Sequence, residues 1–307
     1  MAFGSTSNSQ IGYIAEATWG TTPATPTFQI LRRTSGGPVL RKGTVISDEV
    51  ASNRNVIGEP QISHDVQGNM SIEMSNPVLD DFLESALCGA WATNVLKVGS
   101  TMKSFTIEEK IPVGATNNYH RYLGCVVNTL GLRFQSRSKV MTEVGLMGQK
   151  VDTLATAIIT GATYTAASTD SIFTADKVAS LSILGATPVV RALDLNITNN
   201  TRMRPKVGSI YSEEFGIGQA EITGRLEAYF ESNTLFNSVM SHGTGEISFT
   251  VGVDSNEKYT FMLGTVQLLN GEVVLGGKDD DVMVNIDFRA VYDSGDASSI
   301  MITRLVA

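Results

Sequence analysis

The chain has 307 residues with a formal net charge of −8, and 42% of them are hydrophobic, so it can form two ordinary domains or one large β domain with a substantial core. The acidic balance disfavours a general nucleic-acid-binding protein, which would carry a basic face. Two cysteines without CxxC spacing, Cys88 and Cys125, argue against a disulfide framework and indicate buried thiols in a reducing compartment.

The segment 1–27 is rich in Ser, Thr, Gly and Pro and contains Thr22-Pro23 and Thr25-Pro26. Residues that precede proline favour extended backbone, so we predict an extended N-terminal arm rather than a helix. Two interpretations of this arm remain open: a frayed terminus or a segment that orders against a neighbouring subunit. The first ten residues contain no basic residue and no apolar run, so we expect no secretory signal.

A first structural unit is predicted over 28–151. The residues from Asn69 to Ser75 alternate between apolar and polar, which indicates a strand with one buried face. Asn76-Pro77 is a favourable helix start and Gly89 a favourable stop, so we predict a helix in the Leu- and Phe-rich segment between them. The other expected elements are strands over 28–33, 39–48, 101–111, 119–127, 129–137 and 139–151, and a long polar loop over 49–66.

A connector rich in Ala and Thr spans 152–176, and a second unit follows over 177–307. The residues from Glu221 to Tyr229 alternate cleanly, so we expect a strand there. Ser232 or Asn233 is expected to cap a short helix that ends at Gly243. The other expected elements are strands over 178–184, 189–198, 245–253, 258–268, 272–275 and 282–292, a long loop over 199–215 and a hairpin turn over 276–280.

The second unit repeats the first at several places and in the same order. Pro38-Val39-Leu40-Arg41 is matched by Pro188-Val189-Val190-Arg191, and Ser104-Phe105-Thr106 by Ser248-Phe249-Thr250. Because chance rarely preserves such an order, we infer an internal duplication, which is typical of proteins that assemble by repetition. The pattern of elements predicts a mainly β chain built from two β-sandwich or half-barrel units, each with one short helix. One face of each sheet would contact a core, and the other would contact solvent or a water-filled space.

Signatures of catalysis or of metal and cofactor binding are missing from the sequence. The three histidines, His64, His120 and His242, lie far apart without a metal-binding spacing, and no nucleophile elbow occurs. The run 279–281 consists of three aspartates, which we interpret as a solvated hairpin turn because it lacks the spacing of a calcium loop. We therefore predict no catalytic, metal or cofactor site, while a β-rich carbohydrate-binding or hydrolytic protein stays open as an alternative.

Two pairs of residues fall at matching positions in the two units. Arg54 and Arg204 lie in the long polar loops, where each is either simply solvated or part of a loop that orders against another subunit, with the arginine paired to a carboxylate. Glu73 and Glu227 lie on the polar faces of matching strands. They are either exposed to solvent or form an acidic lining on an inner surface that several copies share.

Three stretches of the chain carry a resemblance to a known family. The run Tyr13-Ile14-Ala15-Glu16-Ala17-Thr18-Trp19-Gly20-Thr21-Thr22-Pro23 is similar to the opening of tail tube (major tail) proteins of long-tailed, non-contractile bacteriophages. The stretches from Asp48 to Arg54 and from Gly68 to Trp91 resemble the same family, and the duplication extends the resemblance to the second half. None of these phrases is a catalytic signature.

The resemblance implies a tube of stacked rings whose sheets join across subunits into a ring-wide β-barrel. DNA and the tape measure protein would occupy the lumen, and tail terminator and distal tail proteins would lie at the ends. By position, 49–66 and 199–215 would join one ring to the next, with Arg54 and Arg204 in these contacts. Glu73 and Glu227 would face the lumen, where negative charge repels phosphate and lets DNA slide without sequence-specific binding.

The resemblance also implies an oligomeric state and a location. Relatives with one unit per chain form hexamers, so two units per chain favour a trimer with pseudo-sixfold symmetry over a hexamer. The protein would be a component of the virion tail, made in the host bacterial cytoplasm, without membrane attachment. A ring protein of a contractile or secretion-type injection system remains an alternative, which a surrounding sheath or secreted free rings would reveal.

Overall fold

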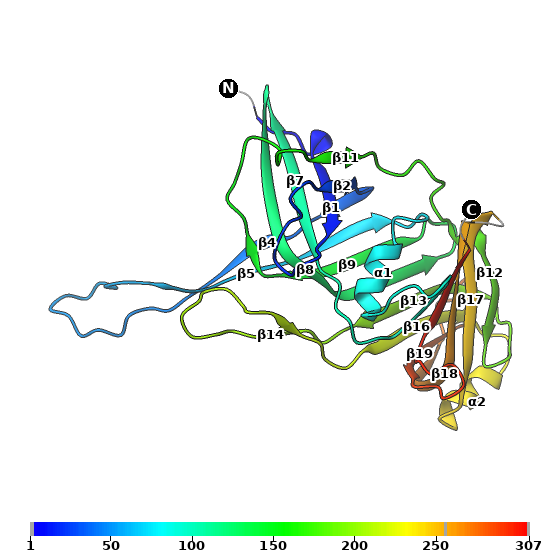
Figure 1. Ribbon diagram of the computed structural model, residues 1–307. Helices are drawn as coiled ribbons and strands as arrows, with labels where there is room; N and C mark the ends of the chain where they lie inside the picture. Colours follow the sequence, from blue (N-terminus) through cyan, green and yellow to red (C-terminus); the bar gives the residue numbers. More distant parts are fainter. Residues whose placement is uncertain (1–2, 255–256, 306–307) are drawn as a thin grey trace.

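The protein, in a computed structural model that describes residues 3–254 and 257–305, is mainly β with two short α-helices (Figure 1). Its first half contains β1 Gln10–Ala15, β2 Thr27–Ile30, β3 Arg33–Gly36, β4 Val39–Thr44, β5 Gln61–Glu73, α1 Asp80–Leu87, β6 Val95–Lys97, β7 Phe105–Val113, β8 Thr116–Gln135, β9 Met141–Gly148 and β10 Lys150–Val151. Its second half contains β11 Thr163–Thr165, β12 Val178–Ile183, β13 Val190–Thr198, β14 Arg202–Met203, β15 Phe215–Gly216, β16 Glu221–Tyr229, α2 Thr234–Met240, β17 Thr244–Asp254, β18 Glu257–Val274, β19 Met283–Val291 and β20 Met301–Leu305. Single 3-10 turns lie at Thr6–Asn8 and Ala175–Lys177.

One antiparallel sheet runs through both halves of the chain, and we call it the shared sheet. Its strands lie in the order β4, β5, β9, β8, β13, β16, β19 and β18. The first four strands come from the first unit and the last four from the second, and the pairing pattern is the same in each. The predicted duplication is therefore visible as a repeated topology, and the two units are fused where β8 pairs with β13.

The strands β8 and β18 each serve two layers of the fold. The N-terminal half of β8 pairs with β7, which pairs with β1, while its C-terminal half lies in the shared sheet. The first half of β18 pairs with β17 and β20 in the same way, and its second half pairs with β19. The predicted breaks at residue 128 and between 268 and 272 are wrong, because a β-bulge at each place shifts the register and bends the strand without ending it.

The hydrophobic core lies between one face of the shared sheet and the outer layers. In the first unit Phe82 of α1 packs on Phe105 and Tyr13, with the Tyr13 and Phe82 ring centroids 4.9 Å apart. In the second unit Phe249 stacks on Phe261 at 5.0 Å. Because core residues alternate with polar ones along each strand, the opposite face of the shared sheet is left to water.

Helix α1 begins later than the sequence predicts, at Asp80 rather than next to Asn76-Pro77, which form a turn. Its end agrees with the prediction to within one residue: Cys88 adopts the left-handed conformation, and the Gly89 N–H bonds to the Glu84 carbonyl oxygen at 3.1 Å. The second helix, α2, lies against β18 through Leu235 and Val239. Both helices therefore lie on the core side of the shared sheet.

Two strands at the ends of the chain differ from the sequence-based expectation. The predicted arm over 1–27 does not hold for β1, which pairs with both β7 and β2 and buries Ile11 and Tyr13. The strand β20, which pairs with β18 and β6, has no counterpart among the predicted elements. Both strands are short, so their own periodicity is weak. Their pairing partners, distant in sequence, determine their structure.

Candidate assembly surface

The shared sheet begins and ends on open edges. At one end β3 and β4 pair with β5 alone, and at the other the second half of β18 pairs with β19 alone, among the residues that the structure describes. Inside the sheet the equivalent edges are joined, because Thr129–Gln135 of β8 pair with Ala192–Thr198 of β13. Open edges present unpaired N–H and C=O groups that can accept another strand. The chain therefore contains, in the β8–β13 pair, an example of how its own two edges can meet.

The face of the shared sheet that points away from the core carries charges of both signs. Carboxylates and cations form cross-strand pairs, such as Arg133 with Asp194 at 3.7 Å across the junction of the two units and Arg225 with Glu272 at 3.4 Å. Arg289 pairs with Glu221 in the same way. Exposed pairs of this kind add little to stability, so they are best understood as keeping this face hydrated. We call it the polar face.

Glu73 and Glu227 occupy equivalent positions on the polar face, as each lies seven residues before the first residue of its helix. Both are partly buried and paired with a cation of the same chain: Glu73 with Lys139, and Glu227 with Arg191 at 3.7 Å. Sequence reasoning found the two glutamates but missed these cations, which come from other strands or turns. The two carboxylates are thus largely compensated rather than free.

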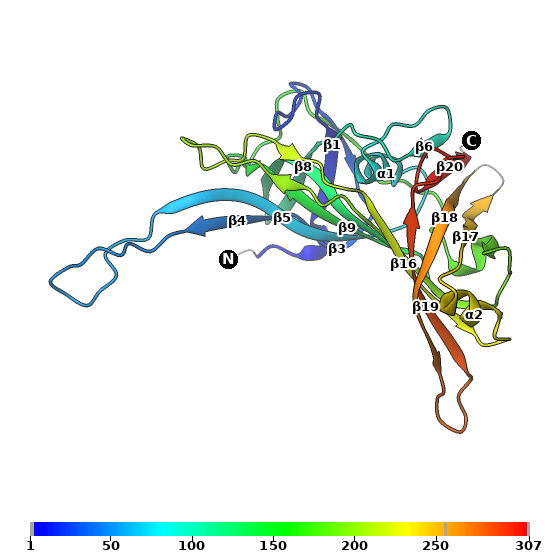
Figure 2. The same cartoon turned by 90° about the horizontal axis from the view of Figure 1, so that it is seen from below.

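Arg54 and Arg204 do not occupy equivalent positions. Arg54 is exposed near the tip of the long hairpin formed by β4 and β5, which projects far from the body of the molecule (Figure 2). Arg204 lies directly after β14 and pairs with Glu214 across a shorter hairpin. The sequence match fails because the two units align differently in space. Val39 pairs with Gln67, and Thr198 pairs with Glu221, which is equivalent to Gln67. Val39 is therefore equivalent to Thr198 in the fold, whereas the sequence match aligns it with Val189.

The predicted loops are also shorter than expected. The strand β5 already begins at Gln61, so the loop over 49–66 is confined to the residues before it, and the loop over 199–215 contains β14 and the first residue of β15. The stretch 61–66 escapes prediction because it lies on the projecting hairpin, outside the core, where no strong apolar alternation is required.

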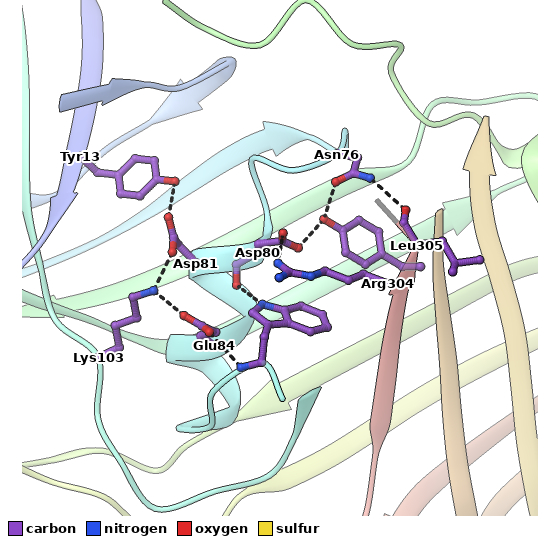
Figure 3. A network of polar contacts seen from close by, with 10 residues as sticks. Tyr13, Asn76, Asp80, Asp81, Glu84, Lys103, Arg304 and Leu305 are labelled. Carbon is purple, nitrogen blue, oxygen red and sulfur yellow. Dashed lines mark hydrogen bonds and ion pairs between the residues drawn. The ribbon is translucent and has the colours of Figure 1, made fainter. Parts of the chain in front are cut away.

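A polar network ties helix α1 to the C-terminal strand (Figure 3). The Tyr259 hydroxyl donates to Asp80 Oδ1 at 2.7 Å, and Arg304 of β20 pairs with Asp80 Oδ2. The Arg304 guanidinium also lies 4.4 Å from the centre of the Trp91 ring. Because Asp80 belongs to the first unit and Tyr259 and Arg304 to the second, this network fixes the two units to each other, a link that sequence spacing does not reveal.

The rest of this network comes from the first unit. Asp81 accepts hydrogen bonds from the Tyr13 hydroxyl at 2.9 Å and from Lys103 at 2.6 Å. Lys103 also pairs with Glu84. The charged side of α1 is therefore neutralised by strand and loop residues, which leaves its apolar side for the core.

Burial raises the pKa of Tyr13 and Tyr259 far above the ordinary value, and the neighbouring carboxylates Asp81 and Asp80 raise it further. Burial also raises the pKa of Tyr122 to about 12. The folded protein holds protons that the unfolded chain releases above a pH of about 10. The stability that these tyrosines confer is complete below that pH and declines as the pH rises through the folded-state values.

We therefore predict alkaline unfolding that begins near pH 10. Circular dichroism should change in the same step as the last rise of tyrosinate absorbance, because the buried tyrosines ionise only when the chain opens. Tyr259→Phe should weaken the pH dependence, whereas Tyr292→Phe, at a position that is 69% exposed, should leave it unchanged. Complete ionisation of all the tyrosines in a chain that is still folded would contradict the prediction.

Glu16, within the Tyr13–Pro23 phrase, is the centre of a second network. Its Oε2 accepts hydrogen bonds from the Gly20 N–H at 2.8 Å and the Ser104 hydroxyl at 2.7 Å. Its Oε1 accepts from the Thr106 hydroxyl at 2.8 Å and the Gly124 N–H at 2.9 Å. One carboxylate thus fixes the turn after β1 to β7 and β8. The Tyr13–Pro23 run was singled out for its resemblance to a family, and sequence reasoning did not predict that Glu16 binds these donors.

Within residues 3–254 and 257–305, no group of three or more His, Cys, Asp or Glu side chains could hold a metal ion. Both cysteines are buried and unpaired, and burial raises the pKa of each thiol. None of the helices in the described part of the chain is long and apolar enough to cross a membrane.

Comparison with known proteins identifies the family of the chain. No curated protein sequence matches the chain. A family model described as phage tail tube protein matches residues 6–290, which is nearly the whole chain and includes both units. This family is one of structural virion components rather than an enzyme class. The chain therefore belongs to the phage tail tube protein family.

Proposed function

We propose that this chain is the ring subunit of the tail tube of a long-tailed, non-contractile phage, and that copies join edge to edge into a hollow ring. The observation that supports this most directly is the pair of open edges on a sheet whose two halves are already joined by equivalent edges. Closure around a ring removes both edges, which would otherwise promote uncontrolled association.

The internal junction supplies a register for the contact between copies. In the repeated topology β18 corresponds to β8, and β3 with the start of β4 corresponds to β13. By this correspondence 268–274 of one copy pair antiparallel with 33–39 of the next. The junctions within and between chains are then alike. Since relatives with one unit per chain form hexamers, three chains of two units each complete a ring of six similar units, which favours a trimer with pseudo-sixfold symmetry over a hexamer.

In this ring the polar face lines the lumen, with Glu73 and Glu227 at its surface. The cross-strand pairs keep that wall hydrated and close to neutral, with some excess of carboxylates, so it offers phosphate no cationic track on which to bind. DNA passes along such a wall during ejection, after the tape measure protein has left it.

The ends of the shared sheet then form the contacts between stacked rings. Both hairpins, with Arg54 and Arg204, project from the end of the sheet opposite the β8–β9 and β18–β19 turns. Hairpins of one ring therefore meet turns of the next, and tail terminator and distal tail proteins occupy the two outermost rings. Synthesis takes place in the host bacterial cytoplasm and the final location is the virion.

Electron microscopy of the purified full-length protein tests this function. We expect hollow filaments with a regular axial repeat, and three chains in each ring. A protein that remains a solitary monomer at high concentration, or filaments with six chains per ring, would contradict the assembly and the trimer respectively.

A further inference from the structure

The shorter hairpin has a contact inside the chain that the long hairpin lacks. Its returning limb, 209–212, lies against β5, where the His64 N–H donates to the Ile210 carbonyl oxygen at 2.9 Å and the Tyr211 and His64 rings lie 5.1 Å apart. The Gln149 side chain donates to the Ser212 carbonyl oxygen at 3.0 Å. A hairpin of the second unit thus reaches back across the junction and holds the first unit.

The long hairpin has an equivalent returning limb. Counted back from Glu73 and Glu227, the residues 55–58 fall at the place of 209–212. Val56 and Ile57 therefore correspond to Ile210 and Tyr211. In their own chain they are 67% and 45% exposed. A two-stranded hairpin that projects alone with such apolar side chains is at best marginally stable in water, so these residues require a partner.

Among the described residues, the second unit has an open surface at the place equivalent to the one where β5 of the first unit receives the shorter hairpin. The residues equivalent to Ser63–Asp65 are 217–219, and the last of them, Gln219, lines a hollow of about 410 Å³. The hollow is lined by Gln219, Ala220, Val291 and Tyr292, among others. Tyr292 is 69% exposed. Its ring, Ala220 and Val291 form the apolar part of the hollow, which Glu221 and Arg289 border.

We propose that the long hairpin is a clasp within the ring: its limb 55–58 lies on the surface formed by 217–219 and Tyr292 of the preceding copy. The occupant is a second copy of this chain, because the internal contact of Ile210 and Tyr211 with β5 is the same arrangement one unit earlier. This contact presupposes the edge-to-edge ring. In this arrangement the returning limb contacts a neighbour in the same ring. Only the tip of the hairpin, near Val50 and Arg54, is left to contact the next ring.

A covalent ladder distinguishes lateral from axial contact. Ile57→Cys combined with Gln219→Cys, joined by a short bis-maleimide in assembled tubes, should give covalent products that end at the number of chains in one ring, which is three for the trimer. Contacts from ring to ring would instead give a ladder without this limit. Val50→Cys with Gln219→Cys is the matched control, and we expect at most a small fraction of its cross-linked yield. The parent chain should give none, since Cys88 and Cys125 are buried.

The outcomes separate the clasp from the tube. A ladder that continues beyond the ring size, or no ladder in well-formed tubes, would overturn the clasp and leave the tube intact. Failure of the unmodified protein to form tubes would instead overturn the ring itself. If the first pair impairs assembly, Val56→Cys with Tyr292→Cys probes the same contact from the other side of the hollow, with the same expected limit.

Discussion

Replacing Arg121 by methionine should lower the free energy of unfolding by about 3–5 kcal/mol. Arg121 Nε donates to Glu108 Oε2 at 2.6 Å, and the two side chains are only 7% and 2% exposed. The guanidinium also donates to the Ala157 carbonyl oxygen at 3.0 Å. The Tyr164 hydroxyl donates to the other oxygen of Glu108 at 2.6 Å. Removal of Arg121 leaves a buried carboxylate without its counter-charge and removes one of the hydrogen bonds between the connector and β8.

Urea denaturation at a protein concentration where the chain is monomeric measures this effect. The double variant Arg121→Met with Glu108→Gln should recover much of the loss, because no unpaired charge remains buried. Arg133→Met, which breaks a largely exposed pair with Asp194, should cost less than about 1 kcal/mol. Equal losses for the single and double variants would show that packing, rather than the stranded charge, determines the stability.

Replacing Glu16 by alanine should cost about 2–4 kcal/mol, since hydrogen bonds to a charged group contribute more than neutral ones and the donors left behind are themselves buried or half-buried. Four donors from three parts of the chain meet this one carboxylate. Their loss releases the turn that carries Trp19, whose ring packs on Phe215 of β15 at 5.3 Å. The effect should therefore extend to the shorter hairpin.

Trp19 fluorescence in a Trp91→Phe background reports this turn directly. Glu16→Ala should shift the emission to longer wavelength in the folded protein as well as lower the free energy of unfolding. Glu16→Gln keeps the shape of the side chain but not its charge, so it should give an intermediate loss. An alanine variant with unchanged emission and stability would refute the central role of Glu16.

The regular strands of the second unit could be predicted from sequence because they are half-buried. Glu221–Tyr229 alternates between a core face and the polar face along its whole length, so its period is unambiguous. The helix α2 begins at Thr234, directly after Asn233, as expected, but Asn233 makes no side-chain cap bond and the helix ends at Met240, before Gly243. Mainly β architecture with a repeated unit followed from these elements.

Other features depend on contacts between distant parts of the chain and could not be predicted in this way. A bulge in β8 shifts the alternation by one residue, which in sequence is indistinguishable from a break between two strands. The cations that pair with Glu73 and Glu227 come from other strands or turns. The link between Asp80 and Arg304 joins residues that lie 224 positions apart in the sequence. Such pairings are set by the fold and leave no local periodicity.

The most direct test of edge-to-edge assembly is a cryo-electron microscopy map of the tube at a resolution that traces strands. We predict three chains in each ring, with 268–274 of one chain hydrogen-bonded antiparallel to 33–39 of its neighbour and the polar face toward a hollow axis. A map in which these two segments end at solvent, or in which the core side of the sheet faces the axis, would contradict the account.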